Sequence, residues 1–378
     1  MDNIWLQSAL WMALALVAAT GSLYITISAA LFEIVVGAIG GNTIGMPLTP
    51  WINYIASVGA VVLTFLAGTD IDPHVVKKHF GASVTIGLMG FFAPYVGCLL
   101  LAHYGLGWPW PQAQIGGIAL STTSVAVVYA VMVETGYNRT ELGKIILAAC
   151  FINDIGTVLA LGLVFANYNV YLLLFAVVTV VTVAALPFIV PPLFKWFGKR
   201  ASEPEIKFLF LVLFALGGLA NLGKSEAVLP AYLVGMALAP FFIKNRELQL
   251  RLRAICFAFL TPFYFLKAGS LIESSALVAG AGLIALFLGV KMLTKFFGIL
   301  PLTRYFKFDP REGMYTTLMM STGLTFGSIS ALYGLTNHII DQSQYTVLLT
   351  AVIGSAVVPT LIAQIWFQPK FEALEEDA

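Results

Sequence analysis

Residues 140–166, TELGKIILAACFINDIGTVLALGLVFA, form an apolar stretch long enough to cross a bilayer as one helix. Two polar side chains, Asn153 and Asp154, lie at its middle. A carboxylate at the centre of a membrane helix costs roughly 2.5–3.5 kcal/mol, and such residues mark ion or proton sites. Asp154 is therefore the first candidate for a group that holds either a proton or a cation. The alternative is a structural Asp whose salt bridge only ties helices together.

The composition of the 378-residue chain is that of a membrane protein. Hydrophobic residues make up 59% and charged residues only 10%, whereas soluble chains carry about 25% charged residues. We therefore expect an all-α polytopic protein, embedded in lipid, with no nucleic-acid partner. Its three cysteines show no disulfide or metal-ligand spacing, and no phosphate-binding loop or nucleophile motif is present. No enzyme activity, cofactor or bound metal is predicted, apart from a transported monovalent cation.

Thirteen apolar stretches approach bilayer length. They cover residues 5–20, 23–40, 51–68, 82–103, 112–135, 140–166, 169–196, 206–222, 226–243, 253–273, 275–299, 311–336 and 342–367. If the N-terminus lies outside, the inner loops hold sixteen of the twenty Lys and Arg residues and the outer loops hold one. The positive-inside rule then predicts an external N-terminus and a cytoplasmic C-terminus.

The fifth and twelfth stretches have polar, helix-weakening centres. The fifth contains Ser121, Thr122, Thr123 and Ser124, and the twelfth contains Ser321, Thr322, Gly323 and Thr325. Thirteen stretches divide as six, one and six, which makes these two corresponding members of the halves. Interrupted spans at corresponding positions indicate a transporter built from inverted repeats. Small and hydroxyl residues also allow close helix packing, which is the simpler explanation for either stretch alone.

Three lysines lie inside predicted spans. Lys291 lies deep in the eleventh stretch, so we expect it to pair with Asp154, the acid nearest the midplane. Lys267, near the outer end of the tenth stretch, is the second candidate for this partner. Lys295 is expected at the inner boundary, where its side chain would extend to the membrane surface.

With these residues in view, the chain resembles the cation:proton antiporter-2 family, which includes Kef-type and NapA-like antiporters. The segments VVLTFLAGTDIDP (61–73), ALSTTSVAVV (119–128), FINDIGTVLAL (151–161) and VKMLTKFFG (290–298) are similar to motifs of that family, in the same order. Thr122 stands where the family usually has Pro. The resemblance covers nearly the whole chain.

This resemblance implies an NhaA-like fold with two broken, crossing helices. It implies dimerisation helices in 1–68 and 206–273, core helices in 82–166 and 275–367, a linker helix at 169–196 and a cytoplasmic tail at 368–378. A homodimer would then move its core as an elevator. Asp154 would carry proton and cation alternately, beside the hydroxyls of Thr122, Thr123 and Ser124. Because Asn153 replaces the first acid of the two-acid motif, one-for-one electroneutral exchange is implied.

The predicted function is exchange of Na⁺ or K⁺ for H⁺ across a plasma membrane, in bacteria the inner membrane. A cation channel and a sodium-coupled solute symporter are the alternatives. One midplane carboxylate with hydroxyls is suited to a small ion rather than to an organic substrate, and a lysine near it does not favour an open pore. The choice between Na⁺ and K⁺ depends on ligand geometry and stays open.

Overall fold

The computed structural model describes residues 3–25, 28–70, 77–165, 170–198, 200, 202–223, 225, 227–272 and 274–369. Within these ranges all regular secondary structure is helical. Ten helices or helix pairs are long and apolar enough to cross a membrane, and two more apolar helices are shorter. Every predicted stretch coincides with a helix or a helix pair, which confirms the all-α class. The number that cross a bilayer stays a prediction, and residues 370–378 of the expected tail lie outside the described part.

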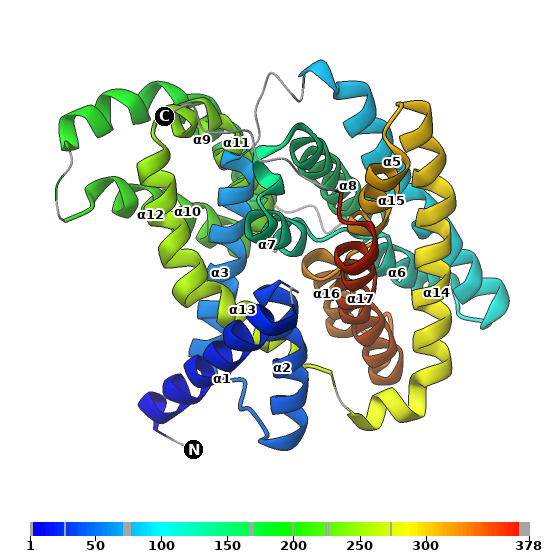
Figure 1. Ribbon diagram of the computed structural model, residues 1–378. Helices are drawn as coiled ribbons and strands as arrows, with labels where there is room; N and C mark the ends of the chain where they lie inside the picture. The colour runs from blue at the N-terminus through cyan, green and yellow to red at the C-terminus, as the bar shows by residue number, and fades with distance from the viewer. Residues whose placement is uncertain are drawn as a thin grey trace.

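Contacts between helices divide the chain into two bundles (Figure 1). We call one the companion bundle. It contains α1 (Ile4–Ile25), α2 (Ala29–Thr43), α3 (Pro50–Thr69), α9 (Val170–Phe197), α10 (Pro204–Leu222), α11 (Val228–Lys244), α12 (Arg246–Ile255) and α13 (Thr261–Ser270). A π-helical turn, Cys256–Leu260, joins the last two.

The other group, here called the crossover bundle, holds the Asn153–Asp154 stretch. It contains α5 (Phe80–Leu100), α6 (Trp110–Ser121), α7 (Val125–Thr135), α8 (Glu141–Phe165), α14 (Ser274–Tyr305), α15 (Pro310–Met319), α16 (Thr325–Thr336) and α17 (Gln342–Ile362). Figure 1 shows α14 and α5 along its outer side, with α6, α16 and α17 between them and the companion bundle. The polar centres of the fifth and twelfth stretches are the two breaks, between α6 and α7 and between α15 and α16.

Glycines allow the helices of the companion bundle to touch through their backbones. A Cβ on Gly269 of α13 would lie 1.9 Å from the Ile34 carbonyl oxygen of α2. A Cβ on Gly235 of α11 would lie 2.2 Å from the Phe65 carbonyl oxygen of α3. Small residues at such crossings are typical of tightly packed membrane helices. A side chain at either position would force the helix pair apart.

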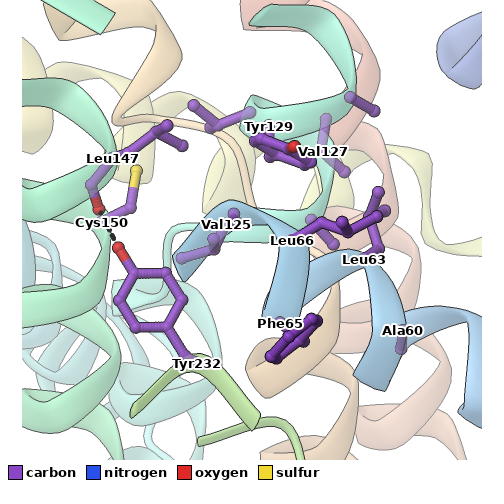
Figure 2. Packing of buried hydrophobic residues seen from close by; sticks show 14 of the residues in the cluster. Ala60, Leu63, Phe65, Leu66, Val125, Val127, Tyr129, Leu147, Cys150 and Tyr232 are labelled. Atoms are coloured by element: carbon purple, nitrogen blue, oxygen red, sulfur yellow. Dashed lines mark hydrogen bonds between the residues drawn. The ribbon is translucent and has the colours of Figure 1, made fainter. Parts of the chain in front are cut away.

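The interface between the two bundles is mostly apolar. In Figure 2, Leu63 and Leu66 of α3 lie beside Val125 and Val127 of α7. A few polar contacts cross it: Tyr232 of α11 donates from its hydroxyl to the Leu147 carbonyl of α8 at 3.0 Å (Figure 2). Other polar contacts also cross it: the Asn138 side chain donates to Asp70 at the end of α3, and Arg253 donates to the Tyr129 hydroxyl.

The first turn of α2 is capped from the other bundle. The Glu134 carboxylate, at the end of α7, accepts hydrogen bonds from the backbone N–H groups of Ala29 (2.7 Å) and Ala30 (3.4 Å). Free N–H groups at a helix start require acceptors, and a carboxylate is well suited to that end of the helix dipole. One bundle therefore completes a helix of the other.

Candidate functional site

The break between α6 and α7 lies in the middle of the crossover bundle. Residues 121–124 are all buried, and Thr122 has an extended backbone with φ −66° and ψ 151°. Ser124 then caps α7, its hydroxyl accepting from the Val127 N–H at 3.4 Å. The break forms with Thr at position 122, so the usual Pro of the resembled family is not required for it.

The second break crosses the first. Thr123 donates from its hydroxyl to the Met320 carbonyl at 2.7 Å, and the Ser124 N–H donates to the Thr322 hydroxyl at 3.4 Å. The predicted crossing of two broken helices is confirmed by these contacts. Three hydroxyls that the sequence also marked, those of Ser121, Ser321 and Thr322, donate instead to carbonyls one turn earlier in their own helices.

Lys295 of α14 ties the two breaks together. Its ammonium donates to the Thr122 carbonyl at 3.1 Å, to the Thr123 hydroxyl at 2.7 Å and to the Met320 carbonyl. An ammonium has three N–H donors, and all three find an oxygen here. The two carbonyls stand just beyond the C-terminal ends of α6 and α15, where the helix dipole favours a cation. Lys295 is thus a built-in positive charge that neutralises two helix ends.

Asn153 bridges the α6–α7 break from α8. Its side-chain oxygen accepts from the Thr123 N–H at 2.9 Å, and its side-chain nitrogen donates to the Ser121 carbonyl at 3.3 Å. An amide accepts and donates in this way, whereas an ionised carboxylate at the same position could only accept. The Asn that replaces an acid at this position therefore has a structural role of its own.

Asp154, the next residue, stands in contrast to these satisfied groups. Its side chain is 4% exposed, and its Oδ1 atom is buried without a hydrogen-bond partner. Lys295 bonds to Thr123, whose N–H donates to Asn153, the neighbour of Asp154, but it forms no ion pair with Asp154 itself. A buried carboxylate oxygen without a partner is costly unless it takes up a proton or a cation. Asp154 can therefore hold one exchangeable positive charge, either a proton or a cation.

Lys291, the expected charge partner of Asp154, does not form that pair in the structure. Lys291 is fully buried, but its ammonium donates to the Ser355 hydroxyl of α17 at 2.8 Å. It occupies space that Gly323 leaves free, since a Cβ there would lie 2.3 Å from Lys291 Nζ. Lys267 is half-buried on α13. Within the described ranges neither lysine forms an ion pair with Asp154.

The boundary position predicted for Lys295 is wrong, and the reason is the length of α14. The predicted stretch ended at residue 299, which placed Lys295 one turn from the membrane surface. The helix continues to Tyr305 and has 32 residues. Lys295 therefore lies well inside it, on the same face as Lys291 four residues earlier. The i, i+4 spacing of the two lysines is the sequence feature from which their common, buried position on α14 could have been predicted.

No group of three or more metal-ligating side chains occurs in the part of the chain that the structure describes. The site contains one carboxylate, several hydroxyls and one fixed ammonium. Such a set suits a proton or a weakly held monovalent ion better than a resident divalent metal.

Comparison with known proteins gives the same picture. The family "Sodium/hydrogen exchanger, transmembrane" matches residues 12–369. A probable Na⁺/H⁺ antiporter 3 of Methanocaldococcus jannaschii is 28% identical over 245 residues, which are 62% of each protein. The Na⁺/H⁺-K⁺ antiporter GerN of Bacillus cereus is 22% identical over 89% of this chain and 90% of its own length. The chain spans 42% of cation/H⁺ antiporter 18 of Arabidopsis thaliana, at 23% identity.

A solved structure shares the fold. The sodium proton antiporter MjNhaP1 of Methanocaldococcus jannaschii superposes with a TM-score of 0.67 over 96% of this chain and 98% of that one, at 13% identity. The broad resemblance to cation:proton antiporters is confirmed, while the narrower antiporter-2 assignment stays a prediction. With a match that extends over nearly its whole length, the chain belongs to the transmembrane sodium/hydrogen exchanger family, a family of transporters rather than enzymes.

Proposed function

We propose that this protein exchanges Na⁺ or K⁺ for H⁺ across a membrane, with Asp154 as the group that carries them in turn. The observation that carries the proposal is the buried, unpartnered Oδ1 atom of Asp154 beside a crossing whose other polar groups are bonded. A proton or a monovalent cation satisfies that oxygen, and one excludes the other. The relatives named Na⁺/H⁺ and Na⁺/H⁺-K⁺ antiporters support the choice of ions.

One-for-one exchange follows from the charges at the site. We take Lys295 to stay protonated throughout the cycle, because its ammonium donates to three oxygens, and Asn153 does not titrate. Asp154 then exchanges one H⁺ for one monovalent cation, so that a full cycle moves no net charge. The Ser124 hydroxyl is the first candidate for a further cation ligand, because the Thr123 hydroxyl is bonded to the Lys295 ammonium.

The movement we propose is an elevator. The crossover bundle would slide against the companion bundle, whose close α2–α13 and α3–α11 contacts favour a rigid body. The companion bundle would also form the homodimer interface, with α9 as its link to the moving part. We place the N-terminus outside and the C-terminus in the cytoplasm of a bacterial plasma membrane, on the distribution of Lys and Arg.

The test is proton movement in proteoliposomes that contain a pH-sensitive dye, with Li⁺, Na⁺, K⁺ and Rb⁺ added in turn. We expect saturable, cation-dependent proton flux in the wild type and less than about one-twentieth of it in Asp154→Asn, which cannot cycle a proton. Glu141→Gln is the matched control, since it removes an acid at the surface, where ion pairs contribute little. Flux that persists in Asp154→Asn refutes the assignment, and conductance without saturation favours a channel.

A further inference from the structure

A tyrosine of the companion bundle reaches the crossing of the broken helices. Tyr264 of α13 lies half-buried with its hydroxyl oxygen 2.6 Å from the hydroxyl oxygen of Thr325, the first residue of α16. The sequence marked Thr325 but gave no reason to single out Tyr264. The contact joins the two bundles at the start of a half-helix, close to the candidate site.

Thr325 continues the contact into the other break. Its hydroxyl oxygen lies 3.3 Å from that of Ser124, the cap residue of α7. Three hydroxyls, from Tyr264, Thr325 and Ser124, thus form a row that connects both half-helix starts with the companion bundle. Ser124 directly follows Thr123, whose N–H donates to the side chain of Asn153, the residue before Asp154. The row is therefore part of the surroundings of the candidate carrier.

Hydroxyl oxygens keep lone pairs after each has formed a hydrogen bond. At the crossing, the carbonyls of Thr122 and Met320 accept from the Lys295 ammonium, whose positive charge repels a second cation. The oxygens best able to join Asp154 around a small cation are those of the hydroxyl row. Hard cations prefer such oxygen ligands, and discrimination between them depends on the number and positions of these ligands.

We propose that Tyr264 is a specificity-determining residue of the transport site, a hydroxyl ligand that the companion bundle supplies to the cation held at Asp154. The proposal rests on the exchange function proposed above. Its consequence is that the ligand set depends on the position of the crossover bundle. Thr325 and Ser124 travel with Asp154, whereas Tyr264 stays behind with α13. The cation therefore loses one oxygen when the bundle moves, which weakens its binding and favours release.

Tyr264→Phe tests this, with Tyr232→Phe as the matched control. Each substitution removes one hydroxyl that crosses the bundle interface and keeps the ring, but the Tyr232 hydroxyl bonds only to the Leu147 carbonyl. Initial rates of proton flux in proteoliposomes give the apparent KM for Na⁺ and for K⁺. We expect Tyr264→Phe to raise the apparent KM for Na⁺ by about three- to tenfold. This is the change expected when the bound cation loses one contact about as strong as a hydrogen bond. The ratio of the two KM values should change, while the maximal rate stays within about twofold.

Tyr232→Phe should leave both KM values and their ratio unchanged. Equal KM changes in the two variants, or a change in maximal rate alone, would show that the Tyr264 hydroxyl only holds the bundles in register, and would overturn the proposal. Unchanged kinetics in Tyr264→Phe would overturn it as well. A wild type without cation-dependent proton flux would instead refute the exchange function itself, so the two failures are distinguishable.

Discussion

Two neighbouring residues of α8, Asn153 and Asp154, lie in opposite polar surroundings. At the crossing of the broken helices, Asn153 and Lys295 form five hydrogen bonds, four with buried backbone groups and one with the Thr123 hydroxyl. At Asp154, a buried carboxylate oxygen has no partner. The difference indicates how an unwound backbone and a binding site coexist in lipid. The protein's own side chains neutralise the permanent polar ends, and one group is left for the transported ion.

The strongest way to break this contrast is Lys295→Met. The substitution leaves the buried Thr122 carbonyl without its donor and removes one of the two donors of the Met320 carbonyl, and a buried group without a partner costs about 1–3 kcal/mol. We expect exchange to fall below about one-tenth of wild type, and the melting temperature in detergent to drop by several degrees. Lys207→Met, at an exposed lysine of α10, is the control. A Lys295→Met protein that melts and transports like wild type would show that Lys295 does not hold the crossing together.

Asn153→Asp should alter the site rather than abolish it. The new carboxylate still accepts from the Thr123 N–H, but it cannot donate to the Ser121 carbonyl and adds a second acid near Lys295. We expect partial transport that now carries a current on a solid-supported membrane, whereas the wild type carries none. Asn153→Ala removes both of these bonds without adding an acid and should stay electrically silent. A clear current from the wild type would contradict electroneutral exchange.

Lys291→Met should have the smallest effect. Lys291 has one oxygen partner, Ser355, whose own hydroxyl also donates to the Val352 carbonyl at 2.7 Å. The substitution therefore leaves the Ser355 hydroxyl with a hydrogen bond, and the apolar Met side chain fills the same buried space. We expect exchange above about half of wild type and a melting temperature within a few degrees. If Lys291→Met is as inactive as Lys295→Met, Lys291 is the partner of Asp154 after all, or a second proton carrier.

Much of this architecture could be predicted from the sequence because lipid imposes simple rules. Bilayer-length apolar stretches fix the helices, and polar residues in the middle of a stretch mark a break or a site. Asp154 and the two broken stretches follow from these rules. The partner of a buried charge does not, because it depends on helix rotation and length. The predicted end of the α14 span was six residues too early, which placed Lys295 at the inner boundary, whereas both lysines are buried and Lys295 lies at the crossing.

The roles of Asn153 and Tyr264 depend on tertiary contacts, which no local sequence pattern predicts. Asn153 was interpreted as a missing acid, whereas the structure shows an amide that needs both its donor and its acceptor. Tyr264 lies more than sixty residues from Thr325, and a tyrosine in an apolar helix is unremarkable in sequence. Both roles can be recognised only once the packing of the helices against one another is known.

The shared cap at the start of α2 gives this protein a natural reporter of its own position. The Ala29 and Ala30 amides belong to one bundle, and the Glu134 carboxylate that holds them belongs to the other. Whenever the bundles separate at that end, these two amides lose their acceptor and become open to exchange with solvent deuterium. The protection of a single helical turn would then record, without any attached label, the fraction of time the transporter spends in the arrangement seen here.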